Sequence, residues 1–133
     1  MPHGDIGDGW PMAIFLTDLI VRINGNSSDI IMKAIESGDF SDPVFEEAAE
    51  ILRKSAEAGM FQTGYDSQDY GTAMNLFTNG QSAMFYMGSW EASMALNQDI
   101  SEDIRSNVGV FTMPALKTGK GKQSDIAAWN GGG

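Results

Sequence analysis

One stretch, residues 77–91, constrains the fold of this chain most strongly. Its sequence is Phe-Thr-Asn-Gly-Gln-Ser-Ala-Met-Phe-Tyr-Met-Gly-Ser-Trp-Glu. Gly80 suits the left-handed position that closes a helix, and the uncharged, aromatic run Ser82–Met87 predicts a strand buried on both faces. Ser89 is expected to cap the next helix. Because ligands often bind where a strand leads into a helix in an α/β domain, Trp90 is a candidate ligand platform.

The rest of the chain carries mostly helical patterns, which are set by apolar spacing, proline and glycine positions and acidic caps. The predicted helices cover residues 10–23, 43–58, 68–79 and 90–96, and a short amphipathic piece is expected at residues 30–35. Two further extended segments are expected at residues 108–114 and 125–129. Asp18 and Arg22 are four residues apart and are expected to pair on the surface of the first helix. The sequence therefore predicts a helix-rich α/β fold.

The size and the charge of the chain limit the class of protein to which it can belong. A chain of 133 residues with 42% apolar content can form one domain with a core of its own. Its 18 acidic and 8 basic residues give a formal charge of −10, which disfavours nucleic acid and anionic membrane surfaces as partners. The absence of cysteine excludes disulfides, thiolate metal sites and cysteine nucleophiles.

The glycine-rich ends of the chain shape the predicted domain organisation. Residues 1–9 are interpreted as a loop or a non-native start, and residues 131–133 as a truncated glycine strand. We therefore interpret residues 1–133 as a single fragment of a longer protein; the alternative for the carboxyl end is a flexible glycine tail.

Several polar clusters have residue types that occur in metal or phosphate sites. His3, Asp5 and Asp8 match no usual metal spacing, and residues 24–29 lack the acidic anchor of a calcium loop. The segment Lys117–Lys122 has the wrong order of glycine and lysine for a P-loop, so we interpret it as a mobile basic turn on the surface. The sequence predicts no metal and no cofactor.

The three tryptophans suggest binding chemistry. Each lies beside a turn: Trp10 between glycine and proline, Trp90 after a Gly-Ser corner, and Trp129 before Asn130 and Gly131. A tryptophan face can stack on the C–H face of a sugar while neighbouring polar groups satisfy its hydroxyls. A position in the core is the alternative for each ring.

Catalytic motifs are scarce. There is no G-x-S-x-G elbow, and the only histidine lies in the N-terminal loop, so a Ser-His-Asp arrangement lacks a convincing base. Glu91, next to Trp90, is the one carboxylate that could serve a glycosidase together with a partner carboxylate. A glutamate in the first turn of a helix is more often there for the helix dipole.

The order of these motifs resembles a known family. The segments Asp8–Pro11, Ile23–Asn26, Phe40–Pro43, Leu76–Met84, Gly88–Glu91 and Val108–Pro114, followed by the terminal glycines, are similar to those of extracellular solute-binding proteins that serve bacterial ATP-binding-cassette sugar importers, the group of maltose-binding protein. The resemblance covers residues 10–133, and its most specific part is the F-x-x-G-x-x-A-M segment that runs into G-S-W-E.

The resemblance implies a two-lobed periplasmic-binding-protein fold of type II, of which this chain would be mainly a part of the second lobe. It implies that Trp90 stacks on sugar, that Trp10 lies close to the cleft, and that Trp129, Asn130 and Gly131 border the site. Glu91 is added as the neighbour of Trp90. The protein would be extracellular, in the periplasm or as a surface lipoprotein. Its partners would be a carbohydrate and the importer's permease, and it would not be an enzyme.

The sequence is also compatible with two other functions. One is a carbohydrate-active enzyme domain that uses Glu91, and the other is a helical interaction module whose apolar surface meets another chain. Self-association is expected of a truncated lobe, because apolar area that its missing parts would cover is exposed.

Overall fold

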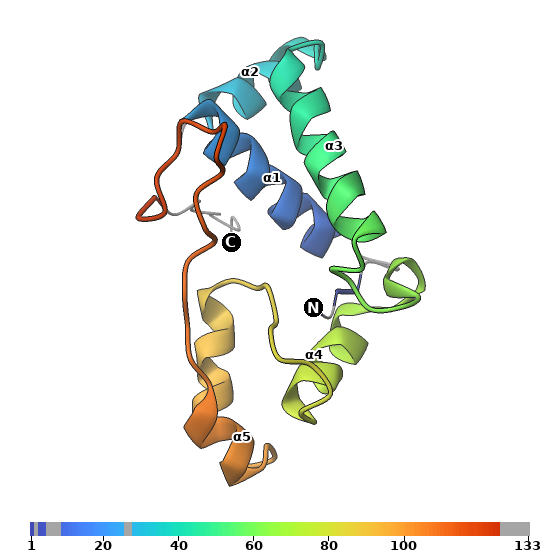
Figure 1. The fold of residues 1–133 in the computed structure, drawn as a ribbon, viewed down its shortest axis with the longest axis vertical. Coiled ribbons are helices and arrows are strands. Elements are labelled where there is room, and N and C mark those ends of the chain that lie inside the picture. Colours follow the sequence, from blue (N-terminus) through green and yellow to red (C-terminus); the bar gives the residue numbers. More distant parts are fainter. Residues whose placement is uncertain (2, 5–8, 26–27, 126–133) are drawn as a thin grey trace. The chain divides into compact units, whose positions relative to one another are not determined.

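The computed structural model describes residues 1, 3–4, 9–25 and 28–125. The elements run, in order, α1 (Trp10–Asn24), α2 (Asp29–Ser37), α3 (Pro43–Glu57), the short 3₁₀ helix η1 (Tyr65–Ser67), α4 (Tyr70–Thr78), a 3₁₀ helix η2 (Ser89–Leu96) and α5 (Glu102–Asn107) (Figure 1). The described residues are therefore rich in helix and contain no strand. The four helices that the sequence predicts are present, the last of them as the 3₁₀ helix η2, and the amphipathic piece forms α2.

The described residues form two compact units. Unit 1 consists of Met1–Met12 and Gly59–Val110, and unit 2 consists of Ala13–Ala58 and the chain from Phe111 to Asp125. Helix α1 begins in unit 1 and continues in unit 2. Unit 1 contains η1, α4, η2 and α5, and unit 2 contains α2 and α3.

Local sequence signals explain where the helices begin and end. Helix α3 starts because the Asp42 carboxylate accepts a hydrogen bond from the Val44 N–H at 2.9 Å, with Pro43 in the first turn. Gly38 adopts the left-handed conformation that ends α2, with φ of 71°. On the exposed face of α3, Glu50 pairs with Lys54 and Arg53 pairs with Glu57, as the four-residue spacing predicts.

Each unit buries its own apolar side chains. The core of unit 2 takes Phe15, Leu19, Ile20, Val21 and Ile23 from α1, Ala34 from α2, and Val44 and Ala48 from α3. The buried residues of unit 1 include Phe61, Ala73 and Met94. In α1 the buried apolar residues lie mostly in the C-terminal half of the helix, whereas Ala13 is exposed.

The strands predicted at Ser82–Met87 and Val108–Pro114 do not form. A strand needs a neighbour that accepts and donates its backbone hydrogen bonds, and no such ladder joins either segment to another described residue. The first segment is not buried on both faces either, because Met84 is exposed while Phe85 contacts the ring of Phe77. Most of the third extended segment, residues 126–129, lies outside the described residues.

Two details at helix ends also differ from the prediction. Ser89 is the first residue of η2 and does not cap it; Gly88 precedes the helix, and its carbonyl accepts from the Glu91 N–H at 3.1 Å. Helix α5 was not predicted. Its cap, in which the Ser101 hydroxyl accepts from the Ile104 N–H, lies within a polar stretch with too few apolar residues to show helical periodicity.

Asp18 and Arg22 form the predicted pair, with 3.7 Å between Oδ1 and Nε, but they are buried instead of lying on the surface. Their side chains are only 6% and 3% exposed. The lysine-glycine turn is also corrected: its lysines are exposed, but its backbone is held by hydrogen bonds to α1. None of the helices in the described part of the chain has the length and apolar character needed to cross a bilayer.

Candidate functional site

Trp90 lies at the start of η2 with its ring accessible. It is 47% exposed, and the ring packs over Gly88. A Cβ at position 88 would lie 2.1 Å from Cζ3 of Trp90, so only glycine leaves room for the indole in this position. The indole of Trp90 therefore packs against the backbone of the Gly-Ser corner, and much of the surface of the ring remains in solvent.

Trp90 is the end of a series of aromatic rings in unit 1. Its ring centroid lies 6.0 Å from that of Trp10, with an angle of 63° between the planes, and Trp10 lies 5.2 Å from Tyr70. Tyr70 in turn lies 6.3 Å from Phe85, which lies 5.8 Å from Phe77. We call these five residues the aromatic row. Tilted and edge-to-face contacts at these distances stabilise aromatic pairs.

The aromatic row unites two residues that the sequence predicts with three that it missed. The sequence predicts Trp10 and Trp90 as site residues, whereas it gives no site role to Tyr70 and Phe77, in the helix predicted at residues 68–79, or to Phe85, in the strand predicted as buried. All three are instead partly exposed. The row draws on α1, α4, η2 and the segment before η2, so no single periodic pattern in the sequence could have revealed it.

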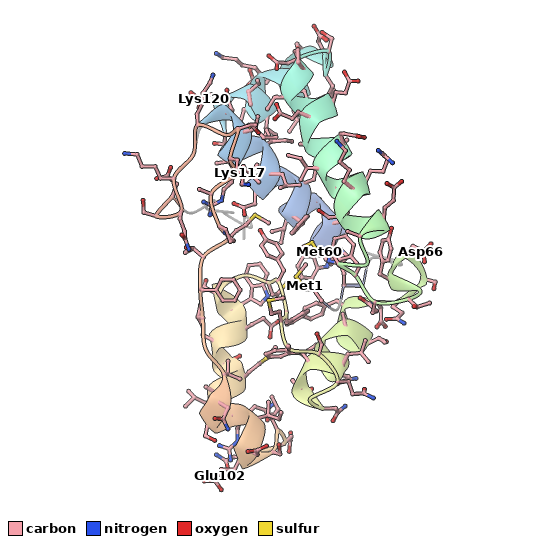
Figure 2. The ribbon with its side chains drawn as sticks, in the orientation of Figure 1. Met1, Met60, Asp66, Glu102, Lys117 and Lys120 are labelled. Carbon is pink, nitrogen blue, oxygen red and sulfur yellow. The ribbon has the colours of Figure 1, made fainter. Side chains whose placement is uncertain are left out.

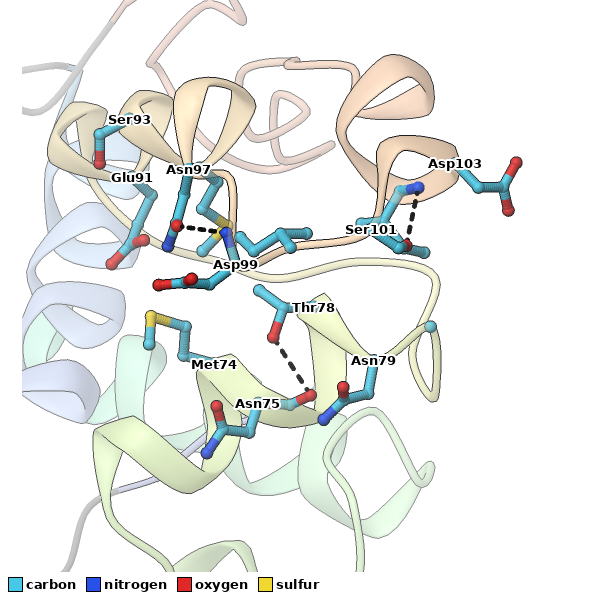
Figure 3. Close-up of a pocket in the computed structure, with 14 residues that line it drawn as sticks. Met74, Asn75, Thr78, Asn79, Glu91, Ser93, Asn97, Asp99, Ser101 and Asp103 are labelled. Atoms are coloured by element: carbon cyan, nitrogen blue, oxygen red, sulfur yellow. Dashed lines mark hydrogen bonds between the residues drawn. The ribbon is translucent and has the colours of Figure 1, made fainter.

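Glu91 lies in a different place, a pocket of about 780 Å³ between α4 on one side and η2 with α5 on the other (Figure 3). Trp90 and Glu91 are adjacent in η2, and adjacent residues of a 3₁₀ helix point about 120° apart because the helix has 3.0 residues per turn. We call the pocket that contains Glu91 the polar pocket. It is lined by Met74, Asn75, Thr78, Asn79, Gly80, Glu91, Ser93, Met94, Asn97, Asp99, Ile100, Ser101, Asp103 and Ile104.

The lining of the polar pocket is rich in hydrogen-bonding groups and has no basic residue. The carboxylates of Glu91 and Asp99 extend into the space beside Met74, whereas Asp103 points away from it (Figure 3). Burial raises the pKa of the Glu91 carboxyl. Its Oε1 atom is buried and has no hydrogen-bond partner among the described residues. Such a carboxylate is an acceptor for a donor brought by a ligand.

The other predicted site residues lie outside the described part of the chain: Trp129, Asn130 and Gly131 are beyond residue 125. Among the described residues no group of three or more histidine, aspartate or glutamate side chains is arranged to hold a metal ion. What the described site offers is an exposed aromatic surface and a separate pocket of amides, hydroxyls and carboxylates.

Comparison with known proteins gives one match. The family model described as bacterial extracellular solute-binding protein matches residues 7–132. No curated protein and no solved structure matches the chain. The match covers all the helices described above.

Proposed function

Because the chain belongs to the bacterial extracellular solute-binding protein family, we propose that it binds a carbohydrate, without altering it chemically, for delivery to an ATP-binding-cassette importer. Members of this family bind a solute for transport and are generally not enzymes. The finer assignment, an oligosaccharide as the solute and an importer's permease as the receiver, is our proposal.

The observation that carries the proposal is the pairing of Trp10 with Trp90. Two indoles from different parts of the sequence lie edge to face, and Trp90 keeps 47% of its surface exposed. A sugar ring presents apolar C–H faces that stack on such a surface, and an aromatic contact contributes about 1 kcal/mol beyond simple burial. A series of rings also suits a ligand of more than one sugar unit.

The polar pocket is separate from the aromatic row, so its groups would recognise the hydroxyls of a sugar unit beyond the one that stacks on Trp90. Glu91 has an unpartnered carboxylate oxygen at the polar pocket, and sugar hydroxyls are donors that such an oxygen accepts. We propose that Trp129, Asn130 and Gly131 also border the ligand. This assignment rests on the position of these residues in the sequence, after the basic loop.

We propose further that the chain forms part of the second lobe of a two-lobed binding protein of type II. The motif order that supports this is the F-x-x-G-x-x-A-M segment, which is followed by G-S-W-E. Lobes that close on the sugar would present the closed form to the permease, so the ligand would act by shifting the population of closed molecules. The protein would act in the periplasm or as a lipoprotein on the cell surface.

The test is titration calorimetry of the full-length protein with a panel of glucose, xylose, galactose and mannose oligosaccharides. We expect one class of sugar to bind, and we expect Trp90→Ala to weaken that binding at least tenfold, with partial retention in Trp90→Phe. Leu96→Ala, which removes another exposed apolar residue of η2, is the matched control. Undiminished binding by Trp90→Ala would remove Trp90 from the site.

One observation favours a second function, a glycoside-cleaving domain. The pKa of Glu91 is raised by burial, and Asp99 lines the same pocket; an acid with a raised pKa beside a second carboxylate is the requirement of a glycosidase. This hypothesis predicts turnover of a nitrophenyl glycoside that Glu91→Gln abolishes. Binding of sugar without turnover by the intact protein would dismiss it.

A further inference from the structure

The lysine-glycine loop of unit 2, residues 116–125, is fixed to the C-terminal end of α1. Arg22, which is buried, donates from Nη1 to the Lys122 carbonyl at 2.6 Å and from Nη2 to the Asp125 carbonyl at 2.9 Å. In return, the carbonyls of Arg22 and Ile23 accept from the N–H groups of Gly121 and Lys120, at 2.8 and 3.2 Å. Four hydrogen bonds therefore join the loop to one end of one helix.

Two glycines make this close approach possible. A Cβ at Gly119 would lie 2.6 Å from the carbonyl oxygen of Arg22, and a Cβ at Gly121 would lie 2.9 Å from the same oxygen. These are backbone atoms of a helix, so they cannot move aside as the end of a flexible side chain can. The alternation of glycine and lysine thus places backbone against α1 at one residue and a lysine at the next.

The lysines of the loop face solvent. Lys117, Lys120 and Lys122 are exposed and account for three of the eight basic residues of a chain with a formal charge of −10. No ion pair joins them to another described residue. Two carboxylates form hydrogen bonds with other groups of the loop: Asp125 accepts from the Lys122 backbone N–H, and Glu47 of α3 accepts from the Thr118 hydroxyl. Figure 2 marks Lys117 and Lys120 on this loop.

From this arrangement we infer that the loop is a docking surface for an acidic segment of a partner protein. Three cations on an anchored backbone keep a fixed spacing, so carboxylates at matching positions pair with them without first ordering the loop. Complementary charge of this kind sets orientation and speeds encounter more than it adds affinity. The surface is distinct from the aromatic row and the polar pocket, and it does not depend on which solute the protein binds.

The charge of the whole chain favours an acidic protein segment over an anionic membrane. A lipid surface is an extended field that acts on every charge within about 10 Å, the Debye length at 0.1 M salt. A chain that carries 18 acidic residues is repelled by such a surface as a whole. A short acidic segment of a partner protein contacts only the loop, so the carboxylates elsewhere on this chain stay in solvent.

The experiment measures binding of the full chain to an immobilised hexaglutamate peptide by interferometry at about 0.1 M salt, with hexaglutamine as the blank. The double variant Lys117→Gln/Lys120→Gln is compared with Lys33→Gln/Lys54→Gln, which changes the net charge equally on α2 and α3. We expect the loop variant to lose about fivefold in affinity, since exposed ion pairs are individually weak. The control variant should retain nearly all of it. Equal losses in both variants, or no binding of the unaltered chain, would overturn the proposal.

A glycine pair tests whether the anchored backbone matters. Gly119→Ala keeps every charge but pushes the loop away from Arg22, whereas Gly109→Ala places its methyl group in open space. We expect Gly119→Ala to weaken hexaglutamate binding and Gly109→Ala to leave it unchanged. Full affinity in Gly119→Ala would refute the requirement for a fixed spacing. Binding to vesicles with about 30% phosphatidylserine in preference to the peptide would replace the protein partner with a membrane.

Discussion

The indole rings of Trp10 and Trp90 lie 6.0 Å apart between centroids, with their planes inclined by 63°. Each tryptophan lies at the start of a helix: Trp10 is the first residue of α1, and Trp90 is the second residue of η2. Because the two helix starts meet in unit 1, two exposed or half-buried aromatic faces form one surface. This relationship is the structural basis of the proposed sugar platform.

Replacing Gly88 with alanine should disturb this platform without altering any aromatic residue. The backbone at Gly88, with φ of −84° and ψ of 175°, accommodates any residue, so the effect is purely steric. The new methyl group would overlap the ring of Trp90 and force it to another rotamer. We expect a shift in tryptophan emission and, in the full-length protein, weaker sugar binding. Gly109→Ala is the control, and an unchanged spectrum of Gly88→Ala would contradict the observed packing.

Glu91 should make stability depend on pH. Burial raises the pKa of Glu91 in the folded chain above the usual value of 4.5. The folded state therefore binds the Glu91 proton more tightly than the unfolded state does. The contribution of Glu91 to stability therefore falls as pH rises from about 4.5 through the folded pKa. We expect Glu91→Gln to be more stable than the unaltered chain at pH 7 and to lose this advantage below pH 4.5.

The measurement is urea unfolding followed by circular dichroism from pH 3.5 to 7.5. Glu36→Gln, which removes an exposed carboxylate of α2, serves as the control and should show no comparable trend. A Glu91→Gln variant that is less stable than the unaltered chain at neutral pH would show that the carboxylate has a favourable partner.

Breaking the buried pair on α1 should be costly. Arg22→Met leaves the Asp18 carboxylate buried without its cation and removes both hydrogen bonds to the carbonyls of the loop. Loss of one partner of a buried pair typically costs about 3 kcal/mol or more. We expect lower stability in urea and faster tryptic cleavage after Lys117, Lys120 and Lys122, detected by mass spectrometry. Arg53→Met, which removes exposed pairs on α3, should cost much less; equal costs would contradict the assigned burial.

The cap of α3 gives a prediction that is independent of the site. Asp42→Ala removes the oxygen that accepts from the Val44 N–H, and the loss of such a cap costs about 1 kcal/mol. Asp42→Asn keeps an acceptor at the same position and should cost only a fraction of this. Urea unfolding of the three chains measures the difference, and equal stability of Asp42→Ala and the unaltered chain would show that the cap contributes nothing.

The helices illustrate what could be predicted from sequence. Their signals are local: Asp42 and Pro43 at the start of α3, Gly38 after α2, and the apolar spacing of α1. The strands could not be predicted in this way. An apolar run such as Ser82–Met87 becomes a strand only if another segment lies beside it and pairs with its backbone, and the run itself does not specify that neighbour.

The sequence by itself determined the helices and their ends, the chemical types of the candidate site residues, and a motif order specific enough to indicate the solute-binding family. Only the tertiary structure decided that Trp10 meets Trp90, that Glu91 lies in a separate polar pocket, and that Arg22 is buried and holds the lysine loop. The physical reason is the range of the interactions involved. Capping and helical periodicity act within a few residues, whereas packing joins residues whose distance along the chain leaves no pattern in the sequence.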